Sequence, residues 1–222
     1  MALISASITK ILTVLQDPQK LNYQVPELAQ YFNLAISYLS RELAKWGSRT
    51  GVTNTTLTYG IGIFSQPLPS DFLALCKNEK GEDRVFNASN SYDRLSRSEV
   101  SDLDDWESET AADSGTVSEF IIDGANLIVH PRAKASTSIK LYYHQLASIV
   151  DDSSTMPWSG WFTDPIEQFV LRMCHLRSEM GGFAQVDVAD YERLSRQCRD
   201  LLTQREGTEI KMTPAAGIGF GW

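Results

Sequence analysis

Residues 118–143 read SEFIIDGANLIVHPRAKASTSIKLYY, and their pattern indicates the fold more directly than any other part of the chain. β-Branched and aromatic residues gather in three short runs, which predict strands at 118–122, 126–130 and 137–143. The Asp123-Gly124 pair between the first two runs is typical of a tight hairpin turn, because glycine adopts a positive φ without strain. Three strands joined in this way form an antiparallel meander.

Upstream of the meander, the sequence predicts further strands and one long excursion. β-Type runs occur at 55–59, 61–64 and 84–86. Residues 87–115 are instead rich in serine, aspartate and glutamate. The few apolar anchors of that segment are Leu95, Val100, Leu103 and Trp106. We therefore expect a surface segment with one short helix.

Helical periodicity appears at both ends of the chain. Apolar residues recur every three or four positions in four segments, 4–15, 25–46, 163–180 and 187–202. In the third segment Asp164 can cap the helix, and Pro165 fits the first turn, where a missing amide does no harm. The sequence therefore predicts an α+β fold: a helical bundle from the N- and C-terminal helices, an inserted antiparallel β lobe and an extended C-terminal arm.

The expected domain boundaries follow these changes of pattern. They are 1–50 for the N-terminal helices of the helical lobe, 51–150 for the inserted β lobe with its acidic loop, 151–210 for the C-terminal helical hairpin and 211–222 for the arm. Small residues in the arm precede an apolar end that consists of Ile218, Phe220 and Trp222. We expect a flexible arm that carries aromatic anchors.

Composition excludes several classes of protein. A formal net charge of −8 argues against a protein that grips nucleic acid or an anionic membrane through phosphate contacts. No apolar run approaches the roughly 18 residues of a membrane span, and the N-terminus lacks a signal-peptide layout, so we expect a cytosolic protein with no membrane partner. Three cysteines without CxxC spacing favour buried thiols over a disulfide scaffold or a zinc ribbon.

The usual signatures of enzymes and cofactor sites do not occur. Neither a GxxxxGK loop nor a GxSxG elbow is present. His130 and His144 belong to different strands, and Cys174 and His175 diverge by about 100 degrees on a helix, so no ligand set forms. The acidic run 102–109 lacks the glycine of a calcium loop and is better explained as a solvated segment. We expect no catalytic residue, no metal and no cofactor.

One series of motifs points to a known family. Its members are LPSDF at 68–72, FIIDG at 120–124, LIVHP at 127–131, IKLYY at 139–143 with Leu146, and the helix entry WFTDP at 161–165. In this order they resemble the head-to-tail adaptor (connector) proteins of tailed bacteriophages, over roughly residues 68–202. The acidic segment 87–115 is unusual for that family, and the N-terminal helices carry no matching motif.

The resemblance implies a structural virion protein with no enzymatic activity. Copies would form a ring, usually of twelve, that docks under the portal protein, lets viral DNA pass and offers the attachment surface for a tail or nozzle protein. The arm, with Ile218, Phe220 and Trp222, would reach the portal. The protein would be found at the head-tail junction of the virion, and in the host cytoplasm during assembly.

A ring of this kind needs two different complementary patches on each copy. Candidates on the outer faces of the C-terminal helices are Arg172, Arg177, Glu179, Arg193, Arg196 and Arg199, which ordinary solvation explains equally well.

Two other functions stay open. One is a carbohydrate or ligand-binding module that uses the β lobe and the aromatic side chains of Tyr92, Trp106 or Trp158, and the other is a hydrolase with an acidic site at 102–109. The aromatic stretch 156–162 favours core packing at the junction of the lobes over an interface.

Overall fold

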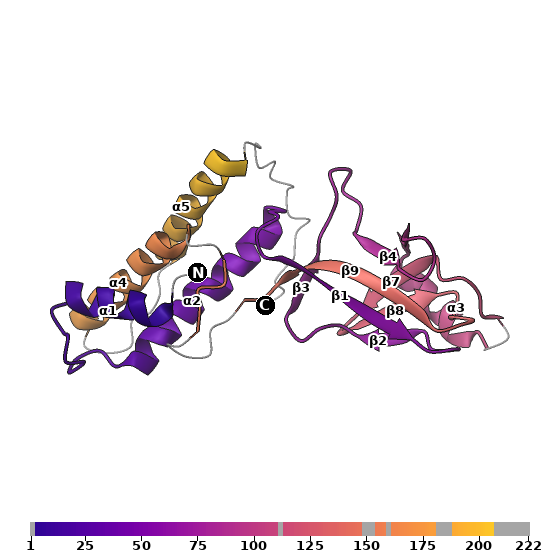
Figure 1. Cartoon of the computed structure of the whole chain (residues 1–222), viewed down its shortest axis with the longest axis horizontal. Helices are drawn as coiled ribbons and strands as arrows, with labels where there is room; N and C mark the ends of the chain where they lie inside the picture. The colour runs from indigo at the N-terminus through magenta and orange to yellow at the C-terminus, as the bar shows by residue number, and fades with distance from the viewer. Residues whose placement is uncertain (1–2, 111–112, 148–153, 159–160, 181–187, 207–222) are drawn as a thin grey trace. The chain divides into compact units, whose positions relative to one another are not determined.

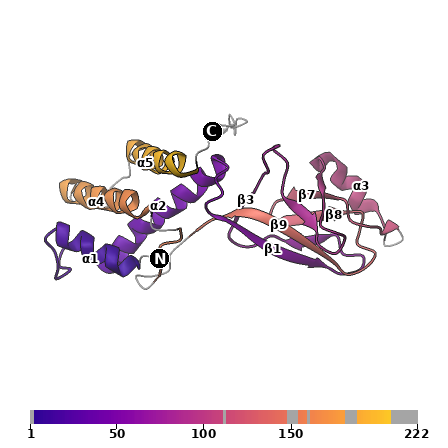
Figure 2. The same ribbon diagram turned by 45° about the horizontal axis from the view of Figure 1, so that its top comes forward.

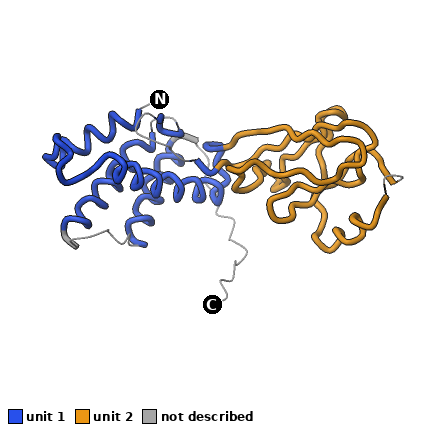
Figure 3. The backbone as a smooth tube through the Cα atoms, turned by 90° about the horizontal axis from the view of Figure 1, so that it is seen from below, with its two compact units in different colours: residues 1–51, 146–222 blue, residues 52–145 orange. Residues whose placement is uncertain are grey.

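The computed structural model describes residues 3–110, 113–147, 154–158, 161–180 and 188–206. The chain divides into two compact units, coloured separately in Figure 3. Residues 1–51 and 146–222 make up the helical unit, and residues 52–145 make up the β unit. Helices and strands together confirm the predicted α+β class (Figure 1). None of the described helices is long and apolar enough to cross a membrane.

The residues that the structure describes in the helical unit form four helices. They are α1 (Ile4–Val14), α2 (Val25–Lys45), α4 (Thr163–Met180) and α5 (Val188–Glu206). Helix α2 packs against α4 and α5, and α1 packs against α4, as Figure 2 shows from a second direction. Apolar side chains that share the inner faces of these helices form one core, which includes Ile8, Phe32, Leu39, Val170, Met173, Leu194 and Leu202. The predicted helical periodicity is therefore confirmed for all four segments.

Two details of the helices differ from expectation. Helix α4 already begins at Thr163, so Asp164 lies in its first turn and directs its carboxylate to Lys10 Nζ at 3.4 Å. Asp164 is therefore not the residue before the helix. The apolar periodicity of the segment 187–202 predicts that Val188 faces inward, but 69% of it is exposed at the start of α5. The first turn of an amphipathic helix can lie beyond the surface that its apolar stripe covers. The sequence also predicts a helix end at Gly181-Gly182, which lies outside the described residues.

In the described part of the β unit there are nine strands and two short helices. They are β1 (Val52–Tyr59), β2 (Ser65–Pro67), β3 (Phe72–Leu75), β4 (Val85–Asn87), β5 (Asp93–Arg94), β6 (Ser96–Arg97), η1 (Val100–Asp102), α3 (Leu103–Ser108), β7 (Glu119–Asp123), β8 (Asn126–His130) and β9 (Thr137–Gln145). One sheet has the order β1-β9-β4-β5, and β3 also pairs with β9. The other sheet has the order β2-β8-β7-β6. The predicted hairpin is confirmed, since β7 and β8 pair up to Asp123 and Asn126 around Gly124, whose φ is +55°. The predicted three-strand meander is wrong, because β9 pairs with β1, β3 and β4 in the other sheet.

The two sheets enclose a core of their own. Tyr59, Phe120, Leu127, Val129, Ile139 and Leu141 are fully or almost fully buried between them. The Tyr59 hydroxyl in β1 donates a hydrogen bond to the Leu127 carbonyl oxygen in β8 at 2.8 Å, which links one sheet to the other. Burial raises the pKa of Tyr59. The hydroxyl therefore stays protonated and keeps its role as a donor.

Three features of the β unit correct or refine the sequence analysis. The run 61–64 is a turn rather than a strand: Gly62 has a φ of +74°, and 73% of Ile61 is exposed. Glycines on both sides of Ile61 remove the neighbouring side chains that a strand would pack. The β lobe is also not purely antiparallel, since β6 pairs in parallel with β7. The expected short helix in the acidic segment is confirmed as α3, which buries Trp106.

The three thiols agree with the sequence analysis. Cys76, Cys174 and Cys198 are free and buried. Burial raises the pKa of the Cys174 and Cys198 thiols to about 12. Both thiols are therefore protonated at neutral pH and pack as small apolar groups.

Candidate functional site

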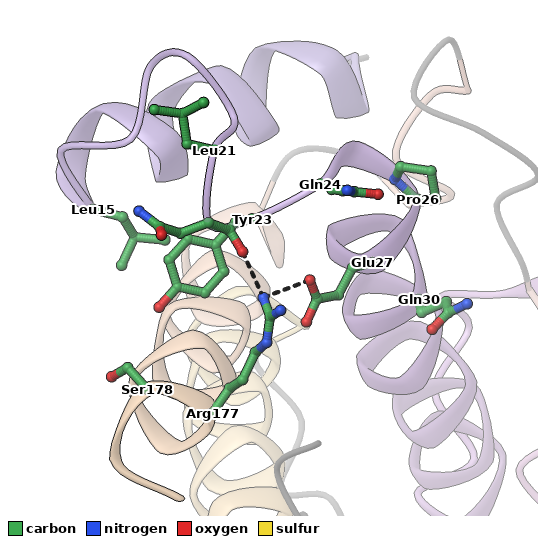
Figure 4. A pocket seen from close by; sticks show the side chains of 10 residues that line it. Leu15, Leu21, Tyr23, Gln24, Pro26, Glu27, Gln30, Arg177 and Ser178 are labelled. Carbon is green, nitrogen blue, oxygen red and sulfur yellow. Dashed lines mark hydrogen bonds and ion pairs between the residues drawn. The ribbon is translucent and has the colours of Figure 1, made fainter. Parts of the chain in front are cut away.

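A hollow in the helical unit lies beside the connection between α1 and α2. It has a volume of about 1010 Å³. It is lined by Leu15, Leu21, Asn22, Tyr23, Gln24, Pro26, Glu27, Gln30, Arg177 and Ser178 (Figure 4). This lining mixes apolar side chains with amide, hydroxyl and charged groups and holds no cysteine or histidine. These groups can make both apolar contacts and hydrogen bonds.

Arg177 is the central charged group of this hollow. Its Nη1 atom lies 2.7 Å from Glu27 Oε2 and donates to the Asn22 carbonyl oxygen at 2.8 Å. The guanidinium also lies 5.3 Å from the centroid of the Tyr23 ring. The same Glu27 carboxylate accepts a hydrogen bond from the Tyr31 hydroxyl at 3.1 Å. Burial is the larger cause and this carboxylate the smaller one of the rise in the pKa of Tyr31 to about 12. Arg177 therefore joins α4 to the start of α2 within one copy of the chain.

Asp17 organises the loop that forms one wall of the hollow. Its carboxylate accepts hydrogen bonds from three successive amides, those of Leu21, Asn22 and Tyr23, at 2.8–2.9 Å. Burial opposes ionisation of Asp17, but these three bonds outweigh it and lower its pKa. The sequence predicts a helix stop at Asp17-Pro18, and an aspartate after a helix also commonly caps the following turn.

We expect Asp17→Asn to lower the thermal stability at pH 7, because a neutral amide accepts these bonds more weakly. A lowered pKa in the folded state means that the carboxylate stabilises the fold above its unfolded pKa, near 3.8, and loses this effect as the pH falls through the folded value. The difference in melting temperature between wild type and variant should therefore shrink below about pH 4. Thermal unfolding of both proteins across pH measures this. Asp104→Asn, at an exposed position, is the control, and a pH-independent difference would contradict the assignment.

The arginines expected at a ring interface divide into two groups. Arg193 and Arg196 are exposed on α5, Arg199 is partly exposed, and Arg172 is exposed on α4 with its Nε atom 3.6 Å from Asp190 Oδ1. Arg177 instead faces the hollow and is paired with Glu27. The side chain of Glu179 lies outside what the structure describes. Arg172 and Arg193 border one shallow depression between α4 and α5, together with Asp190.

The β unit has its own cluster of charged and aromatic groups. His130 stacks on Trp106 at a centroid distance of 4.6 Å, and its Nε2 atom lies 2.9 Å from Glu109 Oε1. Arg132 lies 4.0 Å from the centroid of the Phe64 ring and donates to the carbonyl oxygens of Trp106 and Glu107. These contacts hold α3 and the residues after it on the second sheet. The cluster therefore fixes the acidic segment in place.

The aromatic side chains proposed for a ligand-binding module are not available together. Only 6% of Trp106 is exposed, because it packs from α3 against Ile121 in β7 and Ile128 in β8. Trp158, at 9%, belongs to the core of the helical unit and not to the β unit. Of the three, Tyr92 alone is exposed, at 59%. The expectation of exposed tryptophans was therefore wrong, whereas core packing of Met156, Trp158 and Phe162 is confirmed.

The acidic run forms no metal site that the structure describes. No group of three or more His, Cys, Asp or Glu side chains in the described ranges could hold an ion. The acidic side chains of Asp104, Asp105 and Glu107 are exposed on α3. His144 lies elsewhere, in β9, where burial lowers the pKa of its imidazole and so favours the neutral form. The end of the arm, with Ile218, Phe220 and Trp222, lies outside the described residues.

Comparison with known proteins places this arrangement in a family. A family model described as SU10 adaptor protein matches residues 4–212, which include segments of both units. No curated protein matches the chain. The matched range covers nearly the whole chain. It therefore includes helices α1 and α2, which precede the motifs at 68–202. The chain belongs to the family of SU10 adaptor proteins.

Proposed function

We propose that the protein is the head-to-tail adaptor of a tailed bacteriophage virion. A ring of about twelve copies docks under the portal, gives the tail or nozzle protein its attachment surface and lets viral DNA pass through its channel. The protein acts at the head-tail junction after assembly in the host cytoplasm and catalyses no reaction. The match to the SU10 adaptor model over residues 4–212 is the observation that carries this proposal.

The division into two units supports this role. Each unit has a separate core, so each can keep its own fold while it meets a different neighbour. The net charge of −8 also suits a DNA channel, because like charge keeps the duplex from adhering as it passes. In this assignment Ile218, Phe220 and Trp222 of the arm bind the portal.

The exposed arginines of α4 and α5 supply candidate contacts between neighbouring copies. Arg172, Arg193 and Arg196 are exposed and Arg199 is partly exposed on α4 and α5. Arg177 and Glu179 complete the set proposed for the ring. We expect Arg193→Glu or Arg196→Glu to weaken ring assembly on the order of tenfold or more, because like charges in an interface repel. Thermal unfolding should stay unchanged, since both side chains are exposed.

Lys134→Glu is the matched control for these variants. It makes the same change of charge at an exposed position of the β unit. Assembly is measured by counting adaptor rings on portals in negative-stain micrographs. Equal assembly by the arginine variants and the control would remove these residues from the interface.

The first experiment is negative-stain microscopy of the portal and the adaptor together and separately. A ring of added density under the portal supports the proposal. Two folded proteins that never associate under assembly conditions would contradict it. A monomeric adaptor without portal would not, because an arm that orders on binding defers its entropy cost to that moment.

A further inference from the structure

Strand β1 leaves one side of its sheet open. All eight of its residues pair with β9, from Val52 opposite His144 to Tyr59 opposite Thr137. No other strand pairs with β1 in the described part of the chain. Figures 1 and 2 show β1 on one side of β9 and β3 on the other. We call the unpaired side of β1 the β1 edge.

Hydrogen bonds on the far side of β9 identify the backbone groups at this edge. The amide of Tyr142 donates to the Arg84 carbonyl oxygen, and the Tyr142 carbonyl oxygen accepts from the Cys76 amide, so Tyr142 faces away from β1. Successive residues of an antiparallel pair alternate between facing the partner and facing away. The residues of β1 opposite Tyr142, Lys140 and Ser138 therefore direct their amides and carbonyls outward. These residues are Asn54, Thr56 and Thr58, all exposed.

The β1 edge also lacks the features that usually protect an open strand. Its sequence, VTNTTLTY, contains no charge and no proline, and its pairing with β9 has no register shift. Three other border strands are protected: β2 has three residues and ends in Pro67, while β5 and β6 have two residues each and include Arg94 and Arg97. An eight-residue uncharged edge is a template for strand addition.

The same sheet offers one complementary strand. Strand β3, FLAL, contains no charge or proline, and among the described strands it pairs only with β9, on one side. The register of its pairing with β9 shifts between Phe72 and Ala74. Strands β1 and β3 therefore form opposite borders at the same end of β9. Two different complementary edges on one sheet are what a head-to-tail contact between identical copies requires.

We propose that the β1 edge of one copy pairs with β3 of a second copy, so that the sheet continues from copy to copy around the ring. This inference rests on the proposed ring and names one of its contacts. Because β1 and β3 both run antiparallel to β9, they run in the same direction, and a neighbour related by a small rotation presents β3 parallel to β1. Outward backbone groups of Asn54, Thr56 and Thr58 would supply the hydrogen bonds.

Thr56→Pro tests the edge directly. Proline removes the outward amide of residue 56 and places its ring where the second copy would lie, but it breaks no bond to β9. Thr56→Val is the matched control, since it keeps the amide and a β-branched side chain. We expect Thr56→Pro to reduce rings on the portal on the order of tenfold and Thr56→Val to assemble as wild type does. Equal assembly by a folded Thr56→Pro variant would overturn the proposal.

Hydrogen exchange of the wild-type protein tests the same contact without a mutation. In the assembled ring, the amides of Asn54, Thr56 and Thr58 and those of β3 should exchange at least about tenfold more slowly than in the free protein. Unchanged exchange at Thr56 in assembled rings would overturn the edge contact and leave the proposed function intact. If exchange slowed in β1 but not in β3, the partner of the β1 edge would be the portal or the tail protein. That result would likewise overturn the proposed pairing of β1 with β3. If no ring forms, both proposals fall.

Discussion

Replacing Phe32 with alanine is expected to lower the stability of the helical unit by about 3–5 kcal/mol and to leave the melting of the β unit unchanged. Phe32 is fully buried in the middle of α2, and its ring packs in the core that α1, α2, α4 and α5 share. Removing the ring loses its transfer free energy and leaves a cavity that rigid helices fill only partly. Every residue of that core belongs to the helical unit.

Phe120→Ala is the matched variant for the other unit. Phe120 in β7 is likewise fully buried, in a core drawn from the β unit alone. Differential scanning calorimetry should therefore show two transitions, with Phe32→Ala lowering one and Phe120→Ala lowering the other. If each variant lowered both transitions equally, the two units would unfold as one, and their independence would be contradicted.

Deletion of residues 213–222 is expected to abolish attachment to the portal. The deleted segment contains Ile218, Phe220 and Trp222, and aromatic side chains in partner pockets commonly supply most of the binding energy of an interface. In a ring each copy contributes one arm, so the loss is multiplied by the number of copies. Sedimentation of the portal with the truncated adaptor, followed by microscopy of the pellet, measures the loss.

Two comparisons distinguish a binding arm from a structural one. The substitutions Phe220→Ala and Trp222→Ala together should reproduce the deletion, whereas Ala215→Ser and Ala216→Ser, which keep the anchors, should not. The thermal transitions of the truncated chain should equal those of wild type, because the deletion leaves every described core residue in place. A large loss of stability would show instead that the arm packs on its own unit.

Local signals in the sequence were sufficient for the helices and for the hairpin. Apolar residues every three or four positions, with Pro26 near the start of α2 and Gly47 just after it, leave few alternatives to a helix. Asp123-Gly124 between two β-rich runs likewise specifies its own turn. The run at 61–64 misled because Ile61, Ile63 and Phe64 favour strands, while the glycines among them, whose backbone adopts turn conformations, determine the structure.

The candidate surfaces were only partly predictable. Arg172, Arg193 and Arg196 were placed correctly on exposed helix faces, because helical periodicity separates them from the buried stripe. Arg177 has the same periodicity, but its contacts with Glu27 and Asn22 come from residues about 150 positions earlier in the chain. No local pattern encodes a contact at that separation.

The sequence by itself therefore determined the class of fold, the positions of the helices and the family resemblance, because each depends on neighbouring residues or on the order of motifs. Only the tertiary structure decided that Trp106 and Trp158 are buried, that β9 lies between β1 and β3, and that β1 keeps one open edge. The physical reason is that a strand's hydrogen-bonding partners are set by which segments pack beside it. A sequence specifies which face of a strand is apolar, but an edge exists only once the sheet has formed.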